Sequence, residues 1–335
     1  MGRVLVTGGR GFLGSHLVAR LAREGHQVRI FARPHTEPGR RAPDGTLVPG
    51  ANGHETVWGD IRDPAAVDRA VRGVETVIHL VSNFRRSGSD RTEAHAINVG
   101  GTEHVLQAAL RHGVRRLLHC STVGVHGDVR AIPADEETPV NPGDRYQETK
   151  LIAEQRVREC ARGSRLAATV IRPIPMFGPG DRRMLKLFRA IDRGWFVMVG
   201  SGKPLFQLAY VDDVVEGFLL CLRTERSVGE VVIVGGEEYV PLNDLVRMIA
   251  EALGARRPRL RVPLAPVAWL TRPCEAVCAP LGIDPPLHRR RLSFFENNRA
   301  FRIDKAKRIL GYRPQVSLRD GIERTIAWYR THGWL

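Results

Sequence analysis

The sequence predicts an α/β protein built on a doubly wound parallel sheet, and three observations support this prediction. Short apolar segments alternate with amphipathic segments through the first half of the 335 residues. The first apolar segment leads directly into the glycine-rich turn 8–14. Hydrophobic residues make up 43% of the chain, which is enough for a large buried core. Alternation of this kind places the strands in parallel, with helices on the faces of the sheet.

The expected elements follow from the spacing of the apolar residues. Strands are expected at 4–6, 28–31, 56–58, 76–80, 117–121 and 167–171. Helices are expected at 64–71, at 92–112 with an end near Gly113, and at 146–161. Prolines and glycines after Arg172 mark loops, and shorter elements follow at 231–234, 242–253 and 318–329.

The glycines of the first turn predict a nucleotide-binding site. Gly8, Gly11 and Gly14 are spaced as G-x-x-G-x-x-G between a strand and a helix. Glycine permits the tight turn, the approach of backbone amides to a diphosphate, and close packing of the helix on the strand. We therefore expect an NAD(P)-binding Rossmann domain over residues 1–172. A smaller, substrate-binding α/β portion is expected over 173–335, with segments around 205–235 returning to the Rossmann core.

The composition narrows the class of protein. No apolar run is long enough to cross a bilayer and the first strand begins at Arg3, so we expect a cytoplasmic protein. The net charge of +15 favours anionic partners, but the basic residues are dispersed and no nucleic-acid-binding module accompanies them. No nucleic acid partner is therefore expected. The five cysteines lack the spacing of a metal site, and the sequence indicates no metal.

A tyrosine and a lysine, Tyr146 and Lys150, are one helical turn apart and can face the same cleft. A free tyrosine, with a pKa of about 10, is a poor base, but a nearby ammonium stabilises the phenolate and lowers that pKa. Two hydroxyl residues, Ser121 and Thr122, end an upstream strand, where one of them can bond the same substrate oxygen. These residues predict proton transfer at a substrate hydroxyl.

With these motifs the chain resembles the extended short-chain dehydrogenases/reductases, in the NAD-dependent epimerase/dehydratase group. The resemblance covers almost the whole length and includes the segments 59–63, 98–102, 121–127 and 172–180. It implies that Tyr146 is the general acid or base, that Lys150 also holds the nicotinamide ribose, and that Thr122 orients the substrate hydroxyl. It also implies a homodimer, formed through the helices at 92–112 and 146–161.

The resemblance further implies a set of cofactor-binding residues. They are Gly8, Arg10, Gly11, Phe12, Leu13, Gly14, Arg33, Asp60, Ile61, Leu80, Lys150 and Pro173. Asp60 would meet the adenine, and Asn98 is expected to brace the sheet. Asp212 and Asp213 also match the family and are expected to cap a helix.

The choice between NAD and NADP depends on the end of the second strand. Family members that bind NAD carry an acidic residue there, which grips the ribose 2′-hydroxyl. This chain has Ala32 and Arg33 at that place, and Arg10 lies in the glycine turn. Because arginine suits a 2′-phosphate, NADP is slightly favoured, whereas NAD is expected if the protein is an epimerase.

Departures from the nucleotide-sugar enzymes of the family bear on the small-molecule substrate. Those enzymes carry an asparagine and an arginine where this chain has Pro175 and Phe206, so two diphosphate contacts are missing. Segments at 262–281, 285–289 and 306–314 look more like the 3β-hydroxysteroid dehydrogenase and sterol-decarboxylating branch. The expected substrate contacts are Thr122, Pro175 and Arg299, although Arg299 is equally compatible with a solvated side chain.

Residues 262–281 are rich in Leu, Ala and Pro and contain Trp269, but they are too interrupted to cross a bilayer. Three interpretations are open. The segment can form a lid over a pocket, which is the favoured one. It can dock on an anionic membrane together with the basic run 288–291, or it can pack in the core.

Three functions are therefore compatible with the sequence. The first is an oxidoreductase that moves hydride between a nicotinamide and a secondary alcohol or ketone of a bulky alicyclic, 3β-hydroxysteroid-like substrate. The second is an NDP-sugar epimerase or dehydratase with tightly bound NAD, in which the hydride returns to the substrate. The third is a non-catalytic nucleotide-binding regulatory protein, and the intact Thr122, Tyr146 and Lys150 argue against it.

Overall fold

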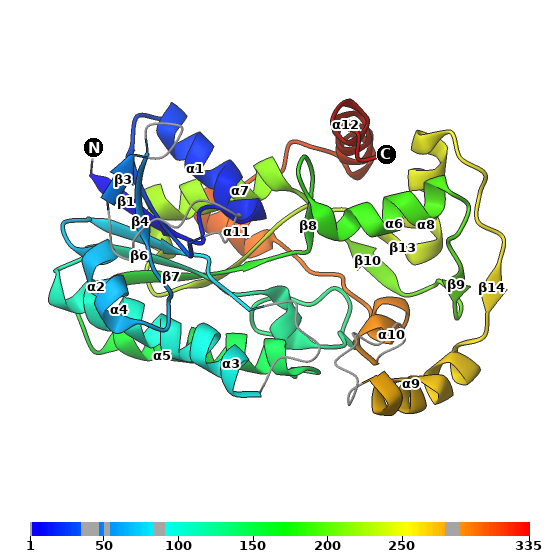
Figure 1. Ribbon diagram of the computed structural model, residues 1–335, viewed down its shortest axis with the longest axis horizontal. Helices are drawn as coiled ribbons and strands as arrows, with labels where there is room; N and C mark the ends of the chain where they lie inside the picture. Colours follow the sequence, from blue (N-terminus) through cyan, green and yellow to red (C-terminus); the bar gives the residue numbers. More distant parts are fainter. Residues whose placement is uncertain (1, 35–46, 50–53, 84–90, 279–288) are drawn as a thin grey trace.

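The computed structural model of the protein describes residues 2–34, 47–49, 54–83, 91–278 and 289–335. Within these residues, eight strands form the main sheet in the order β12-β7-β6-β5-β1-β2-β4-β3 (Figure 1). Its strands are β1 (Arg3–Thr7), β2 (Gln27–Ala32), β3 (Leu47–Pro49), β4 (Glu55–Trp58), β5 (Thr76–His79), β6 (Arg116–Cys120), β7 (Ala167–Pro173) and β12 (Val231–Val234). Only β3 is antiparallel to its neighbour among these described strands. The predicted doubly wound α/β fold is confirmed.

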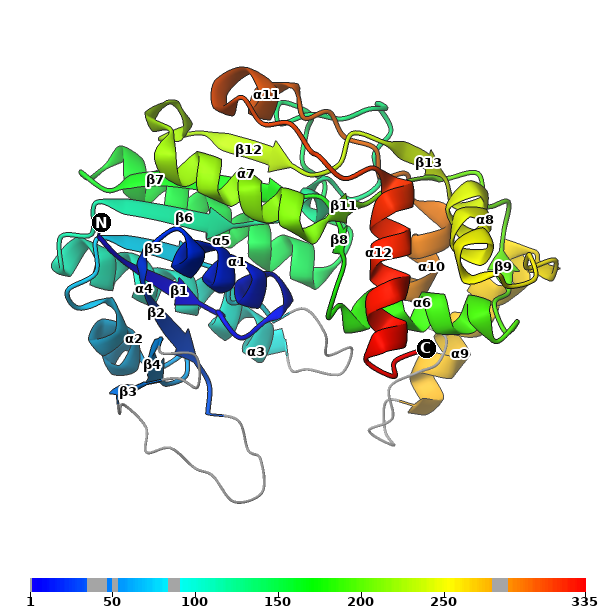
Figure 2. The same ribbon diagram turned by 90° about the horizontal axis from the view of Figure 1, so that it is seen from above.

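Helices cover both faces of this sheet because successive strand residues point to opposite sides (Figure 2). Val4 and Val6 pack in one hydrophobic core with α1 (Phe12–Arg23) and α7 (Val211–Arg223). Leu5, which lies between these valines, packs in a second core. The helices of the second core are α2 (Pro64–Val71), α4 (Gly101–Arg111) and α5 (Arg145–Arg162).

The smaller portion of the molecule is built around a third core and lies beyond the carboxyl ends of the parallel strands (Figure 1). Its helices are α6 (Arg182–Asp192), α8 (Leu242–Leu253), α9 (Leu264–Cys278), α10 (Arg289–Glu296) and α12 (Leu318–Thr331). Three short strand pairs join them: β8 (Met176–Phe177) with β11 (Ala209–Tyr210), β9 (Met198–Val199) with β14 (Arg261–Val262), and β10 (Leu205–Gln207) with β13 (Tyr239–Pro241). Helix α11 (Asp304–Leu310) returns to the main sheet beside β12. The helices that the structure describes include none long and apolar enough to cross a membrane.

The single helix expected at 92–112 is interrupted, which corrects the sequence prediction. Helix α3 (Arg91–His95) and α4 are separated by a π-helical turn at Ala96–Gly100. The turn carries the buried Asn98, whose side-chain oxygen accepts the Asn83 amide at 2.7 Å and whose amide donates to Thr149 Oγ1 at 2.8 Å. Apolar periodicity cannot reveal such an insertion, because polar bonds to another helix and a loop hold it in place.

Candidate active site

The glycine turn that connects β1 to α1 has the shape of a dinucleotide cradle. Gly8 has a φ of 73°, which favours glycine, and its carbonyl accepts the Gly11 amide at 2.9 Å. A Cβ on Gly14 would lie 2.2 Å from the Gly8 oxygen, so the helix approaches the turn as closely as glycine allows. Helix α1 begins at Phe12, directly after the turn, and its first amides are available to a phosphate. A dinucleotide fits these residues.

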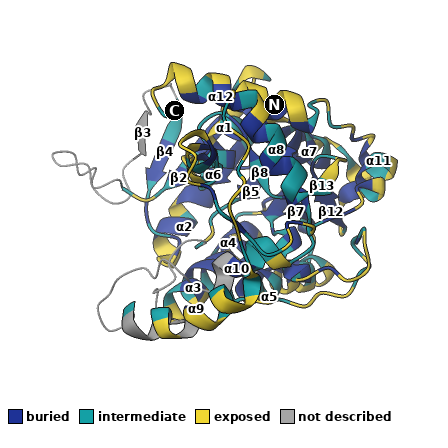
Figure 3. Cartoon of the chain, turned by 90° about the vertical axis from the view of Figure 1, so that its right-hand side faces the viewer, coloured by how far each residue is buried: buried dark blue, intermediate teal, exposed yellow. Residues whose placement is uncertain are grey.

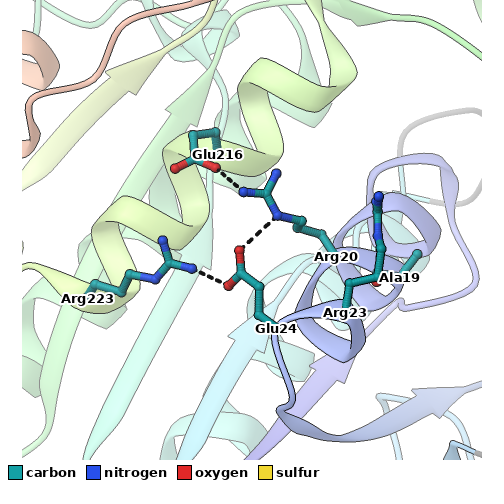
Figure 4. A network of polar contacts seen from close by, with 6 residues as sticks. All are labelled: Ala19, Arg20, Arg23, Glu24, Glu216 and Arg223. Carbon is teal, nitrogen blue, oxygen red and sulfur yellow. Dashed lines mark hydrogen bonds and ion pairs between the residues drawn. The ribbon is translucent and has the colours of Figure 1, made fainter.

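Helix α1 is fixed to α7 by a network of ion pairs (Figure 4). Arg20 donates to Glu24 and to Glu216, both at 2.8 Å, and Arg223 donates to the other oxygen of Glu24. One helical turn before Arg20, His16 of α1 bonds the Pro179 carbonyl at 2.9 Å. Helix α1, which follows the glycine turn, is therefore held both against α7 and against the loop of the smaller portion that contains Pro179.

Thr122 lies beside the first turn of α5, which carries Tyr146. The Asp144 carboxylate caps this helix by accepting the Gln147 amide at 2.9 Å. A Cβ on Gly124 would lie 3.2 Å from Thr122 Oγ1 and 3.4 Å from Gln147 Cγ, so both side chains flank this glycine. Thr122 Oγ1 accepts the Gly124 amide at 3.0 Å. Because the oxygen is already an acceptor within the protein, its hydroxyl proton can be donated outward.

Lys150 lies one turn further along α5, and only 1% of it is exposed. Its Nζ is 3.4 Å from Nε2 of His119, the buried residue before the end of β6. Burial, and then the charge of Lys150, lowers the pKa of His119 well below its usual range. The same two causes lower the pKa of His79 to about 3, and burial lowers the pKa of Lys150 itself. Both histidines are therefore neutral at pH 7, and His119 is able to accept a hydrogen bond from the lysine.

A buried ion pair next to the site escaped the sequence reasoning. Glu154 accepts Arg172 Nη2 at 2.6 Å and Nε at 3.0 Å, and it also accepts the Ser121 hydroxyl at 2.8 Å. Arg172 in turn contacts His126 Nε2 at 3.0 Å. These bonds tie α5 and β7 to the residues on both sides of Thr122. The available signal was that Glu154 is four residues after Lys150 and therefore on the same helical face.

The residues expected at the adenine end lie at the ends of β2 and β4. Arg33 is exposed, and its positive charge is near Asp60. Asp60 is held by Arg62, which donates its amide and Nε to one carboxylate oxygen at 2.9 Å and Nη2 to the other at 2.7 Å. These bonds lower the pKa of the Asp60 carboxyl. The Arg10 guanidinium lies 5.1 Å from the ring centre of Trp58, a contact that the sequence did not indicate.

Other expected cofactor residues have mainly packing positions. Leu13 is buried, and Phe12 packs against the core that contains Val4 and Val6. Ile61 is 4% exposed and packs directly on Gly101, where a Cβ would lie 2.6 Å from Ile61 Cγ1. The Leu80 amide donates to Thr7 Oγ1 at 3.2 Å, and Pro173 is paired with Val234 in the sheet.

The residues expected to contact substrate are held by protein groups. The Pro175 carbonyl accepts the Ala209 amide at 2.9 Å, next to the β8–β11 pair. Phe206 is 5% exposed, and the Arg299 guanidinium lies over its ring at 5.3 Å. Arg299 Nη2 donates to the Ser293 carbonyl at 2.8 Å, and burial lowers the pKa of Arg299 to about 10. The alternative of a solvated Arg299 is therefore wrong.

The expected capping role of Asp212 and Asp213 is also wrong. Tyr210 occupies the position before α7, and both aspartates lie inside its first turn. Asp213 accepts the amides of Gln315 and Val316 at 2.8 and 3.1 Å, so it anchors the chain that leads to α12. Both partners are about a hundred positions away in the sequence. Nothing local could have indicated this role.

Comparison with known proteins agrees with this geometry. The model of the NAD dependent epimerase/dehydratase family matches residues 4–235. A 3 beta-hydroxysteroid dehydrogenase/Delta 5-->4-isomerase of Mycobacterium tuberculosis is 31% identical, over 98% of this chain and 90% of that protein. A 2-alkyl-3-oxoalkanoate reductase of Stenotrophomonas maltophilia is 32% identical, over 96% of this chain and 98% of that protein.

Among solved structures, a dTDP-glucose 4,6-dehydratase of Streptomyces venezuelae with NAD bound superposes with a TM-score of 0.78 at 28% identity. The match covers 99% of this chain and 98% of that one. The glycine cradle, the Tyr146 and Lys150 pair and these matches support one assignment. The chain belongs to the NAD-dependent epimerase/dehydratase family, an enzymatic family of extended short-chain dehydrogenases/reductases that uses a nicotinamide dinucleotide.

Proposed function

We propose that the protein is an oxidoreductase acting on a secondary alcohol or ketone of a bulky alicyclic, 3β-hydroxysteroid-like substrate. The observation that carries the proposal is the contact between Phe206 and Arg299. A buried aromatic ring stands where the nucleotide-sugar enzymes carry an arginine, and the guanidinium above it is bonded to the Ser293 carbonyl. A diphosphate would have to displace these bonds. The Mycobacterium tuberculosis relative named for 3β-hydroxysteroids, at 31% identity, supports the same class of substrate.

In this proposal Thr122, Tyr146 and Lys150 act on the substrate oxygen. The bound cofactor supplies the hydride acceptor or donor. Thr122 donates its hydroxyl proton to the substrate oxygen and orients it, since its own oxygen already accepts the Gly124 amide. Tyr146 removes the hydroxyl proton during oxidation and returns it during reduction. The Lys150 ammonium favours the phenolate of Tyr146 and would bind the nicotinamide ribose from its buried position.

Replacing Tyr146 by phenylalanine tests the mechanism. With NAD or NADP and a 3β-hydroxysteroid, the absorbance of reduced cofactor should rise for the native protein, and kcat should fall about 10²- to 10⁴-fold in Tyr146→Phe. Cofactor affinity should stay unchanged, because the aromatic ring remains and only its hydroxyl is lost. Tyr239→Phe is the matched control, since Tyr239 is 40% exposed on β13. Retained turnover in Tyr146→Phe would exclude the proposed role.

An NDP-sugar epimerase or dehydratase is the second candidate. The likeness to the dTDP-glucose 4,6-dehydratase structure supports it. The two candidates differ in whether cofactor is consumed, because an epimerase or dehydratase returns the hydride to the same substrate. Cofactor that copurifies with the protein, together with sugar conversion and no net reduction of added cofactor, would favour this second candidate. Steady formation of reduced cofactor with a steroid alcohol would favour the first.

We also propose NADP as the preferred cofactor of the dehydrogenase. Arg33 is exposed at the end of β2, and Arg10 of the glycine turn has its guanidinium over the ring of Trp58, which is paired with Ala32 in the sheet. No acidic residue ends β2, where a carboxylate would bind the ribose 2′-hydroxyl of NAD. A 2′-phosphate between two guanidinium groups gains charge-assisted hydrogen bonds that NAD cannot make.

A further inference from the structure

The most exposed large hydrophobic side chains of the described residues gather on one part of the smaller portion. They are Trp269 (83%), Trp195 (70%), Leu260 (62%) and Leu270 (57%). Trp195 precedes β9 and Leu260 precedes β14, and these two strands are paired. Trp269 and Leu270 lie on α9, which begins two residues after β14. We call these four side chains the β9–β14–α9 rim.

The segments that carry the rim adjoin one another. The Met198 amide of β9 donates to the Leu260 carbonyl at 3.0 Å. A Cβ on Gly200 would lie 3.6 Å from Leu264 Cβ at the start of α9, so the helix follows closely on the strand pair. In Figure 1 these segments lie at the end of the molecule opposite the main sheet, and Figure 3 shows exposed and intermediate residues along the described part of α9.

Arginine side chains accompany the apolar residues of the rim. The Arg193 guanidinium lies 5.2 Å from the ring centre of Trp195. Four more exposed arginines lie at 256, 257, 259 and 261. Arg257 is paired with Glu251 at 2.7 Å, but Arg256 and Arg259 form no ion pair with a carboxylate in the described part of the chain. The four apolar side chains of the rim are therefore accompanied by arginines whose positive charge is only partly neutralised by carboxylates.

We propose that the β9–β14–α9 rim docks on a lipid bilayer with anionic headgroups. Tryptophan and leucine side chains gain free energy at the boundary between headgroups and acyl chains, and arginine binds lipid phosphate. An anionic surface also neutralises the arginines, whereas a second copy of the same surface would place like charges together. The net charge of +15 adds long-range attraction of the same sign. This proposal is independent of the substrate and of catalysis.

Vesicle flotation of the whole purified protein tests the proposal. Binding is expected to phosphatidylcholine vesicles that contain about 30 mol% phosphatidylglycerol, with release at about 0.5 M NaCl. Little binding is expected to pure phosphatidylcholine. The double variant Trp269→Ser/Leu270→Ser should bind at least about tenfold more weakly. The control is Tyr239→Ser/Val228→Ser, because these side chains are 40% and 36% exposed outside the rim. It should bind like the native protein.

A second pair of variants separates the rim's charge from the charge of the whole protein. Arg256→Gln/Arg259→Gln should weaken binding severalfold more than Arg69→Gln/Arg226→Gln, which removes two exposed arginines from α2 and from the turn after α7. Equal losses would show non-specific attraction and overturn the proposal. So would an absence of vesicle binding, or a change of oligomeric state in Trp269→Ser/Leu270→Ser without loss of vesicle binding. Brominated lipid should quench the native tryptophan fluorescence and leave that of this double variant largely unquenched, which checks the insertion without relying on flotation.

Discussion

Replacing Glu154 by glutamine would remove the negative charge of the buried ion pair and keep the size of the side chain. The side chains of Glu154 and Arg172 are 1% and 4% exposed, and two hydrogen bonds of 2.6 and 3.0 Å join them. Glu154→Gln therefore leaves a guanidinium in the interior without its counter-charge. Bulk water is kept from the guanidinium, because both side chains are almost fully buried and the carboxylate also accepts the Ser121 hydroxyl.

The expected cost is large because the remaining charge stays buried. Breaking such a pair lowers the free energy of unfolding by about 3–5 kcal/mol. Arg172→Met should cost a similar amount, since it leaves the carboxylate unpaired. The double variant removes both charges and should cost about the same as either single variant. The coupling free energy between the two positions is then about as large as one single effect, about 3–5 kcal/mol.

Urea unfolding followed by circular dichroism measures these four free energies. Arg156→Gln is the matched control on the same helix, because its partners Glu103 and Glu159 are each 3.2 Å away and all three side chains are about half exposed. That substitution should cost less than about 1 kcal/mol. If Glu154→Gln cost no more than the control, or if the two single effects added to within about 0.5 kcal/mol, the buried pair would not stabilise the fold as argued.

Three further predictions concern the cofactor and pH. Gly14→Ala places a Cβ 2.2 Å from the Gly8 oxygen, so fluorescence titration should show at least about tenfold weaker NADP binding, and unchanged affinity would disprove the close packing of the turn. Arg33→Asp should lower the ratio of kcat/KM for NADP over NAD by about tenfold or more, since it removes a charge-assisted phosphate contact; a constant ratio would place the 2′-phosphate elsewhere. The lowered pKa of His79, about 3 against 6.5, means that the unfolded chain binds a proton that the folded chain does not. The contribution of neutral His79 to the free energy of unfolding is therefore complete above about pH 6.5 and declines as the pH falls towards 3. Between about pH 7 and 5 this decline amounts to about 2 kcal/mol. His79→Asn should reduce the loss of stability over that interval by this amount, and an unchanged pH dependence in urea unfolding would contradict the assignment.

Local sequence signals predicted the elements with strong periodicity well. The helices at 64–71 and 242–253 and the strand at 231–234 were predicted at the bounds that the structure shows. Their apolar residues recur at a single spacing, and Pro64 or a clear glycine marks one boundary of each helix. The glycine turn was likewise predictable from the sequence, because its shape depends on Gly8, Gly11 and Gly14, which lie close together in the chain.

Contacts between distant segments could not be predicted in this way. The Arg10 contact with Trp58 and the Arg299 contact with Phe206 join residues whose separation carries no periodic signal. The π-helical turn at Asn98 is stabilised by bonds to Asn83 and Thr149 that form only after the helices have packed. Sequence reasoning therefore identified the chemical groups of the site more readily than the side chains that hold them.

The position of β12 has a consequence for the synthesis of the chain. Six parallel strands of the described sheet come from residues 3–173, whereas β12 is completed only at residue 234. Until then, the outer edge of β7 presents unpaired backbone groups to any other extended chain. A nascent polypeptide passes through this stage on every ribosome, and a fragment that stops at residue 172 never leaves it. We expect that fragment to accumulate as aggregates, and a fragment extended to residue 235 to be markedly more soluble.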